Sequence, residues 1–255
     1  MTIRIGIVGI QGRMGREIAA LAMSDPAFEL IGGVSRNPDP ARANGRRVVR
    51  EVTELLPAVD ALIDFSGPEG AARCAAACAE AGIPLVSGTT GLDAEQRAAL
   101  RAAAERVAVF QAANMSPGVN AILTVLPALL RALEGYDVEI VETHHRDKAD
   151  APSGTALSLA RVIAEVSGEP LDSRTRHGRE GFSPRQPAEI GIHAVRAGGN
   201  PGEHTVILAG DGEEVQIAHR AFSRAAYAQG ALRAARRIVG QPAGWYEPAT
   251  LPGFL

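Results

Sequence analysis

The chain has 255 residues, of which 46% are hydrophobic and 22% charged, and its formal net charge is −3 with a pI near 6.1. This composition is ordinary for a folded globular protein with one large domain or two modest ones. The charge balance excludes strong attraction to nucleic acid or to an anionic membrane surface, and no apolar run approaches the roughly 20 residues that span a bilayer. We therefore favour small-molecule chemistry.

The amino terminus indicates a strand and not an export signal, because M-T-I-R-I-G-I-V-G has no charged n-region and no long apolar h-region. The two cysteines, Cys74 and Cys78, lie in one alanine-rich helical segment. Their spacing on a helix makes a disulfide awkward and favours buried apolar roles. We expect a cytoplasmic protein without disulfides.

A strand, a glycine turn and a helix open the chain. Residues 3–8 form a continuous apolar run typical of a buried parallel strand, which leads into G-I-Q-G-R-M-G and then a helical pattern. The spacing G-x-x-G-x-x-G is less specific than G-x-G-x-x-G, and a merely glycine-rich turn is the alternative. We interpret it as a dinucleotide site in which Gly9 makes the turn, Gly12 admits the pyrophosphate and Gly15 lets the helix pack.

The second strand, residues 28–34, bears on the choice of cofactor. It ends at Ser35 and Arg36, with no carboxylate to hold a ribose 2′-hydroxyl and with an arginine suited to a 2′-phosphate. We therefore favour NADPH over NADH. Arg36 as an ordinary solvated turn residue, and use of both cofactors, stay open.

Three more strands of the first half end in small or hydroxyl-bearing residues. In an open α/β sheet the ligand lies across the carboxyl ends of the strands, so these loops are expected to line one edge. The strands are residues 61–65, 83–86 and 107–111, followed by Ser66-Gly67-Pro68, Gly88-Thr89-Thr90-Gly91 and Ala112-Ala113-Asn114-Met115-Ser116. Residues 38–50, polar and rich in arginine, are expected to form a mobile surface loop.

The second half has a different pattern. We expect a helix over residues 119–133, a flexible polar region over 169–189, a final helix over 223–239, and strands over 136–142, 190–196, 203–209 and 213–218. Consecutive strands of this kind predict a second domain with a mixed or antiparallel sheet. For His193, His204 and His219 a structural role in this sheet is the default.

The stretch from Glu139 to Thr155, E-I-V-E-T-H-H-R-D-K-A-D-A-P-S-G-T, concentrates the chemistry. Lys148 is the only lysine among 26 basic residues, which indicates a group wanted for its point charge or its titratable proton. His144 and His145, beside it, have the side chain that titrates nearest neutrality. The Pro-Ser-Gly-Thr turn predicts a helix start capped by Ser153, where backbone N–H groups can bind a carboxylate.

Two other functions are compatible with parts of this pattern. The adjacent histidines could bind a metal in a hydrolase, although neighbours on an extended segment point to opposite faces and no usual third ligand is near. The chain could also be a dinucleotide-sensing regulator, although it lacks a basic DNA-reading element.

The motifs together resemble the dihydrodipicolinate reductases, also called 4-hydroxy-tetrahydrodipicolinate reductases, over nearly the whole chain. The resemblance rests on G-x-x-G-R-M-G, D-F-S-x-P, G-T-T-G, A-A-N-M-S-x-G-V-N, E-T-H-H-R-D-K-A-D-A-P-S-G-T-A, I-G-I-H-A-V-R, G-E-H-T-V and H-R-A-x-S-R. It implies NAD(P)H-dependent reduction of a cyclic dicarboxylate in the diaminopimelate and lysine pathway. It also implies a homotetramer, with NADPH as cofactor, NADH as the alternative, and no metal.

The resemblance implies a fold and a set of site residues. The fold is α/β, with a Rossmann domain of residues 1–115 and 224–255 and an α+β substrate and oligomerisation domain of residues 116–223. His144 and Lys148 would be catalytic, and which of them donates the decisive proton stays open. The substrate would be bound by His145, Ser153, Gly154 and Thr155, and the cofactor by Gly9, Ile10, Gln11, Gly12, Arg13, Met14, Ser35, Arg36, Gly88, Thr89, Thr90, Ala112, Ala113, Asn114 and Met115.

Two positions depart from the family pattern. Ser35 stands where some relatives carry an acidic residue, which argues against strong use of NADH. Residues 178–189 are slightly longer than usual, and Glu180 replaces a threonine, so the role of this loop stays open.

Overall fold

The computed structural model describes residues 2–43 and 45–255. The chain folds into two compact units. The first consists of Met1–Pro117 together with Arg224–Leu255, and the second is Gly118–Ser223. In the described part of the chain, no helix combines the length and the apolar character that crossing a membrane requires.

The first unit is built on a seven-stranded parallel sheet in the order β12-β6-β5-β4-β1-β2-β3. From β3 to β6 this is the Rossmann order, and it reverses beside β1, which pairs with both β2 and β4. The loops that follow β1 and β4 therefore meet at one point of the sheet edge. The strands are β1 (Ile3–Val8), β2 (Phe28–Val34), β3 (Val48–Val49), β4 (Ala61–Asp64), β5 (Leu85–Ser87), β6 (Ala108–Gln111) and β12 (Gly244–Tyr246).

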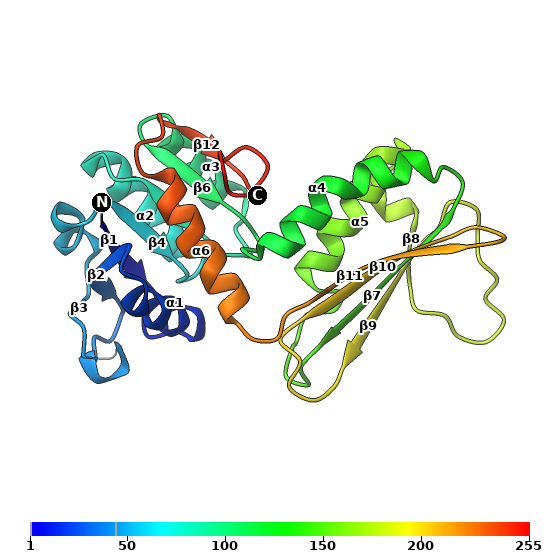
Figure 1. Ribbon diagram of the computed structural model, residues 1–255, viewed down its shortest axis with the longest axis horizontal. Helices are drawn as coiled ribbons and strands as arrows, with labels where there is room; N and C mark the ends of the chain where they lie inside the picture. Colours follow the sequence, from blue (N-terminus) through cyan, green and yellow to red (C-terminus); the bar gives the residue numbers. More distant parts are fainter. Residues whose placement is uncertain (1, 44) are drawn as a thin grey trace. The chain divides into compact units, whose positions relative to one another are not determined.

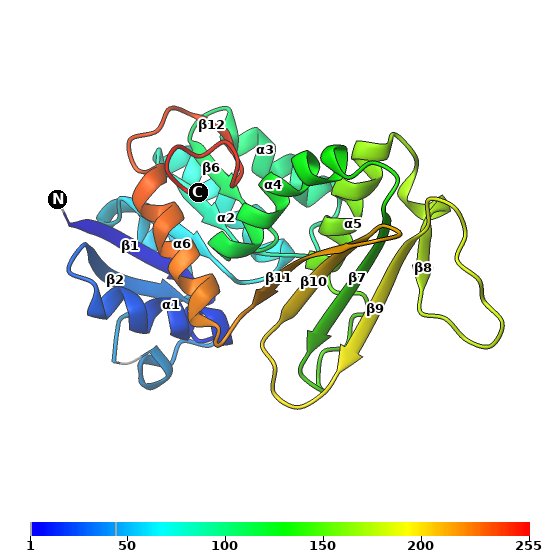
Figure 2. The ribbon, with the colours of Figure 1, turned by 45° about the vertical axis from the view of Figure 1, so that its right-hand side comes forward.

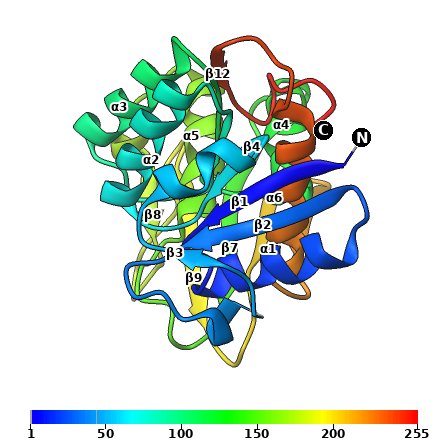
Figure 3. The same ribbon diagram turned by 90° about the vertical axis from the view of Figure 1, so that its left-hand side faces the viewer.

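Helices cover both faces of this sheet, as its continuous apolar strands require. The helices α1 (Arg13–Ser24) and α6 (Ala225–Ile238) pack on one face, and α2 (Pro68–Ala81) and α3 (Ala94–Ala104) pack on the other (Figures 1 and 3). The buried face of α6 is mostly alanine, which lets the helix approach the strands closely. Cys74 and Cys78 are free and buried in α2, as predicted.

Three features of the first unit were not predicted. The region expected to be a mobile loop contains a 3₁₀ turn, η1 (Pro40–Ala43), and the short strand β3, whose Val49 is buried; Asn44 lies outside the described residues. The expectation of a loop throughout was therefore wrong. The other two are α3, which opens with a capping box between Asp93 and Gln96, and β12. Short 3₁₀ turns at η2 (Val52–Glu54) and η3 (Leu56–Ala58) precede β4.

The second unit is a five-stranded mixed sheet, as predicted, with α4 (Pro117–Ala132) and α5 (Gly154–Ser167) on one face (Figure 2). Its core lies between α5 and the central strands and includes Ile140, Leu159, Ile163, Ile192 and Val206. Each such buried side chain contributes about 1.5–3 kcal/mol. The order is β11-β10-β7-β9-β8, where the strands are β7 (Asp137–His144), β8 (Thr175–His177), β9 (Ile190–Arg196), β10 (Glu203–Ala209) and β11 (Glu214–Arg220).

The strand β7 runs two residues further than the predicted 136–142. Its last residues pair on both sides, since Thr143 lies opposite Glu203 of β10 and His144 lies opposite Arg196 of β9. Side chains two apart on a strand share a face, so the extension places Glu142 and His144 together on the helix-covered face.

The polar region 169–189 is more structured than predicted. It contains the 3₁₀ turn η4 (Leu171–Ser173) and the strand β8, which pairs with β9. Residues 178–189 are irregular, but two arginines anchor them to the sheet: Arg179 and Arg185 both form ion pairs with Glu139, and Arg179 also pairs with Glu189.

Candidate functional site

The turn after β1 requires its glycines for steric reasons. Gly9 has a φ of +78°, and a Cβ there would lie 2.6 Å from the backbone oxygen of Phe65, in the loop after β4. A Cβ on Gly15 would collide with the backbone of Gly9 and lie 2.6 Å from the Cα of Ile10. The close packing of α1 on the turn therefore depends on both positions.

The amino terminus of α1 suits an anionic group. Gly12 is the N-cap and offers no side chain, and the first turn has no acidic residue. Gln11 is turned aside, where its Nε2 donates to the backbone oxygen of Asp39 at 2.7 Å. A helix start with accessible N–H groups and no opposing charge binds phosphate well, so this cradle fits the pyrophosphate of a dinucleotide.

A buried carboxylate organises the next loops at the same sheet edge. Asp64, fully buried at the end of β4, accepts hydrogen bonds from the hydroxyls of Ser66 at 2.6 Å, Ser87 at 2.9 Å and Thr89 at 2.8 Å. Burial raises the pKa of Asp64, while these bonds act in the opposite direction. Asp64 thus fixes the loop that begins with Gly88. Asp64 was not among the predicted site residues, because in the sequence it is a single polar residue at the end of an apolar strand.

The remaining predicted cofactor residues lie around this edge to different extents. The backbone N–H of Ala112 donates to Ser87 at 3.2 Å, which joins the loops after β5 and β6. Ala112 and Met115 are buried, whereas Ala113, Thr90 and Arg36 are exposed. Ala112 and Met115 therefore help to shape the loop after β6. Thr90, Ala113 and Arg36 are accessible from solvent and so can be reached by a ligand.

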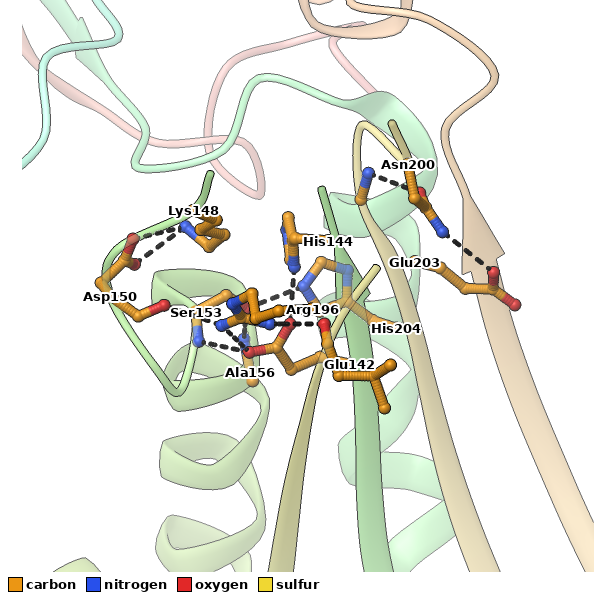
Figure 4. A network of polar contacts seen from close by, with 12 residues as sticks. Glu142, His144, Lys148, Asp150, Ser153, Ala156, Arg196, Asn200, Glu203 and His204 are labelled. Carbon is orange, nitrogen blue, oxygen red and sulfur yellow. Dashed lines mark hydrogen bonds and ion pairs between the residues drawn. The ribbon is translucent and has the colours of Figure 1, made fainter. Parts of the chain in front are cut away.

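In the second unit, Glu142 is the centre of a polar network at the end of β7 (Figure 4). Its side chain is fully buried. One carboxylate oxygen, Oε2, lies 2.5 Å from His144 Nδ1 and accepts from Arg196 at 2.8 Å; the other, Oε1, accepts from Arg196 at 2.7 Å and from the backbone N–H of Ser153 at 3.0 Å. The network joins the ends of β7 and β9 to the start of α5.

The charges in this network favour an ionised glutamate and a neutral histidine. Burial acts to raise the pKa of Glu142, but the hydrogen bonds from Arg196 and His144 outweigh it, and the pKa is lowered. Burial lowers the pKa of His144; Glu142 opposes this, and the positive charges of Lys148 and Arg196 add to it. In the described part of the chain, His144 Nε2 has no hydrogen-bond partner.

Lys148 lies in the loop between β7 and α5. Its ammonium donates to both carboxylate oxygens of Asp150, at 2.7 and 2.9 Å, and Arg196 donates to the backbone oxygen of Asp150 at 2.7 Å. Asp150 is largely exposed. The structure therefore brings Lys148 and His144 to one loop cluster. Arg196 connects them, because it donates both to Asp150, the partner of Lys148, and to Glu142, the partner of His144.

Ser153 is the N-cap of α5, as predicted, and its hydroxyl accepts from the N–H of Ala156 at 3.2 Å. The same hydroxyl lies 2.9 Å from His204 Nε2, and the rings of His204 and His144 meet edge to face with centroids 5.1 Å apart. Gly154, the first helical residue, is exposed, and the first turn holds no acidic residue. The helix start can thus accept a carboxylate.

Two other histidines, His145 and His193, are not part of the cluster. His145 is half-buried, and its backbone oxygen accepts from the N–H of Lys148. His193 faces the opposite side of the sheet, where its Nε2 lies 2.7 Å from Glu139. Across residues 2–43 and 45–255, no three of the His, Cys, Asp and Glu side chains form a group that could hold a metal ion.

A Rossmann unit with an open phosphate cradle, joined to an α+β unit that carries a buried carboxylate–histidine pair, defines the class of nicotinamide-dependent oxidoreductases. Comparison with known proteins narrows this class. Residues 3–115 match the family model described as "Dihydrodipicolinate reductase, N-terminus", and residues 118–251 match "Dihydrodipicolinate reductase, C-terminus". The chain belongs to the dihydrodipicolinate reductase family.

Individual relatives agree with this assignment. The chain is 47% identical to a 4-hydroxy-tetrahydrodipicolinate reductase of Thermomicrobium roseum, over 96% of this chain and 97% of the relative, and 46% identical to one of Rubrobacter xylanophilus, over 96% of each. Among solved structures, a dipicolinate-bound dihydrodipicolinate reductase from a Paenisporosarcina species matches with a TM-score of 0.78 and 25% identity, over 97% of this chain and 98% of that one. An engineered D-amino acid dehydrogenase bound to NADP+ shares the fold, with a TM-score of 0.60 and 18% identity, over 99% of this chain and 97% of that one.

Proposed function

We propose that the chain is a 4-hydroxy-tetrahydrodipicolinate reductase, which uses NAD(P)H to reduce this cyclic dicarboxylate to tetrahydrodipicolinate in diaminopimelate and lysine biosynthesis. The observation that carries the proposal is the Glu142–His144 pair, set beside the only lysine of the chain and the open amino terminus of α5, in a member of this family. Cationic and N–H groups together suit a dicarboxylate.

The first unit would hold the cofactor, which supplies a hydride when bound. Its pyrophosphate is assigned to the cradle of Gly9 to Met14, which has the required glycines and helix start. Ser35 and Arg36, at the end of β2, would contact the adenosine ribose. Gly88 to Thr90 and Ala112 to Met115 would line the rest of the site, on loops that Asp64 and Ser87 hold together.

Residues of the second unit would bind the substrate and handle the proton. The amides of Gly154 and Thr155, with His145, would bind carboxylates at the start of α5. The ammonium of Lys148 would stabilise negative charge that develops on the ring as it is reduced, and His144 would exchange a proton at Nε2.

The proposal is tested by following NADPH and NADH oxidation with substrate generated in place from pyruvate and aspartate semialdehyde by the preceding synthase. Lys148→Arg keeps the positive charge but has no readily lost proton, and general acid–base groups contribute about 10²–10⁴-fold, so we expect kcat to fall at least about 10²-fold. Arg146→Lys, an exposed change two residues away, is the matched control and should keep full activity. Wild-type protein that binds NADPH but does not turn over would instead favour the nucleotide-sensing regulator.

We also propose a preference for NADPH, since the end of β2 offers Arg36 and no carboxylate. Arg36 is exposed and so available to a 2′-phosphate. Arg36→Ala should reduce kcat/KM for NADPH by about tenfold or more and leave that for NADH within about twofold, because the second cofactor lacks the phosphate. Equal losses for both cofactors would contradict this assignment.

Finally, we propose assembly into a homotetramer through the second unit. The face of its sheet opposite α4 and α5 has no helix of that unit on it (Figure 2), and it carries Val141, Val195 and Ile207 among polar side chains. A partly apolar sheet face that no helix of its own unit covers is suited to burial against a second copy. Light scattering coupled to gel filtration should give four times the chain mass, and Val195→Lys should lower it.

A further inference from the structure

The side chains of Glu142 and His144 form a pair whose relative orientation is fixed by hydrogen bonds. They are two residues apart on β7 and share the covered face, and the carboxylate lies 2.5 Å from His144 Nδ1 while accepting three hydrogen bonds from Arg196 and Ser153. Arg196 meets it with two parallel N–H donors. Such bidentate contacts fix the carboxylate plane, so the direction in which Oε2 points at His144 is set by the protein.

The charges determine which ring nitrogen carries the proton. Arg196 balances the carboxylate, so Glu142 can stay ionised beside a neutral imidazole. The groups facing His144 are Glu142 on its own strand, Arg196 on β9, His204 on β10 and Lys148 on the following loop, and the last is paired with Asp150. A neutral ring whose Nδ1 contacts an ionised carboxylate must place its proton on Nδ1, because two acceptors cannot share the contact.

We propose that Glu142 is a positioning residue for the proposed reduction: it holds His144 in the Nδ1–H tautomer, so that Nε2 presents its lone pair and His144 enters the reaction as a proton acceptor. When Nε2 takes up a proton that the substrate loses, the ring becomes an imidazolium that faces the Glu142 carboxylate, and the same proton then returns to the substrate. Lys148, whose ammonium carries a proton at the start, supplies the one proton that the reduction consumes. The kinetic part of this inference rests on the proposed function, whereas the tautomer does not.

The tautomer is measured by ¹⁵N NMR on the full-length protein labelled in histidine, at neutral pH and without ligand. In the wild type His144 should show a protonated Nδ1 and an unprotonated Nε2. In Glu142→Gln this preference should be lost. The double variant Glu142→Gln/Arg196→Gln leaves no unbalanced buried charge and should lose the tautomer preference to the same extent. This result would show that the preference depends on the Glu142 carboxylate and not on a loss of stability caused by an unpaired Arg196. A wild-type His144 that is an imidazolium, or that carries its proton on Nε2, overturns the proposal.

Kinetics give the second readout. Glu142→Gln should lower kcat by about 10²-fold with KM within about twofold, since a histidine in the wrong tautomer binds substrate but does not exchange its proton. In the plot of kcat against pH, the acidic limb of the Glu142→Gln variant should lie at lower pH than that of the wild type, because the carboxylate that raises the pKa of His144 is gone. The matched control is Glu203→Gln on β10, whose carboxylate also pairs with an arginine, Arg220, and whose side-chain hydrogen bonds within the described residues go to Asn200 and Arg220 and not to a histidine. It should keep kcat and pH profile.

These readouts separate two failures. An active Glu142→Gln with an unchanged acidic limb would overturn the positioning role while the reductase assignment stands. Wild-type protein without turnover, but with His144 in the Nδ1–H form, would refute the proposed function and retain the structural half of the inference.

Discussion

His204 makes the stability of the second unit depend on pH in a way that can be calculated. Its side chain, on β10, is only 3% exposed; Nε2 contacts Ser153, and Nδ1 has no hydrogen-bond partner among the described residues. Burial lowers the pKa of His204 to about 4; proton uptake by His144 and the positive charge of Lys148 act in the same direction, against Glu142. A second proton on this ring is therefore strongly disfavoured in the folded protein.

The sign and size of the effect follow from proton linkage. In the unfolded chain the imidazole takes up a proton near pH 6.5, whereas in the folded chain it does so only near pH 4. Between these values the unfolded state binds more protons, so the free energy of unfolding falls as the pH is lowered from about 6.5 to about 4, and this group causes no further loss below that. At about 1.4 kcal/mol per pH unit the full effect is about 3 kcal/mol.

The assay compares wild type with His204→Gln, which keeps a neutral polar group beside Ser153, by urea unfolding at pH 7 and at pH 4.5. On acidification the free energy of unfolding of the wild type should fall by about 2 kcal/mol more than that of the variant. This is a large share of the total free energy of unfolding, which is about 5–15 kcal/mol for a typical protein. His177→Gln, an exposed histidine on β8, should follow the wild type. Parallel losses in wild type and His204→Gln would refute the reasoning, because other groups would then account for the whole acid sensitivity.

Two further predictions concern the first unit. Gly15→Ala should weaken NADPH binding at least about tenfold and lower stability by about 2 kcal/mol, because its Cβ would meet the backbone of the glycine turn. Gly212→Ala, in the turn between β10 and β11 and with open space around it, should change neither. Isothermal titration measures the binding, and thermal unfolding measures the stability. Asp64→Asn should destabilise this unit by about 1–3 kcal/mol in urea unfolding, because the amide cannot accept from all three hydroxyls that the buried carboxylate serves. Full stability in that variant would mean that the hydroxyls find other partners.

Structural features that are encoded by residues adjacent in the sequence were predicted correctly. The apolar run, glycine turn and helix at the amino terminus are contiguous, and the steric roles of Gly9 and Gly15 follow from that order alone. The helix start at Ser153 is likewise encoded in four adjacent residues. The roles of His144 and Lys148 stay predictions, although the structure places both in one loop cluster.

Features that depend on pairing across the chain were missed. Arg196 reaches Glu142 over 54 positions, because β7 and β9 pair in a register that sets His144 opposite Arg196. The motif I-G-I-H-A-V-R ends at Arg196, but it does not show which side chain this arginine meets. A glutamate that ends an apolar strand likewise resembles a solvent-facing one. Asp64 was missed for the same reason, since its partners Ser87 and Thr89 come from the next strand of the sheet.

The division of the first unit between two parts of the chain has a consequence for protein synthesis. Its sheet obtains β12 from the last residues, and the helix that covers much of one face, α6, follows residue 223. Phe254, fully buried, closes against Phe110 with ring centroids 5.0 Å apart. A ribosome has therefore released all of residues 118–223 before it can release α6. The second unit can complete its own core first, while one face of the Rossmann sheet is covered only in part, by α1, until α6 has been synthesised.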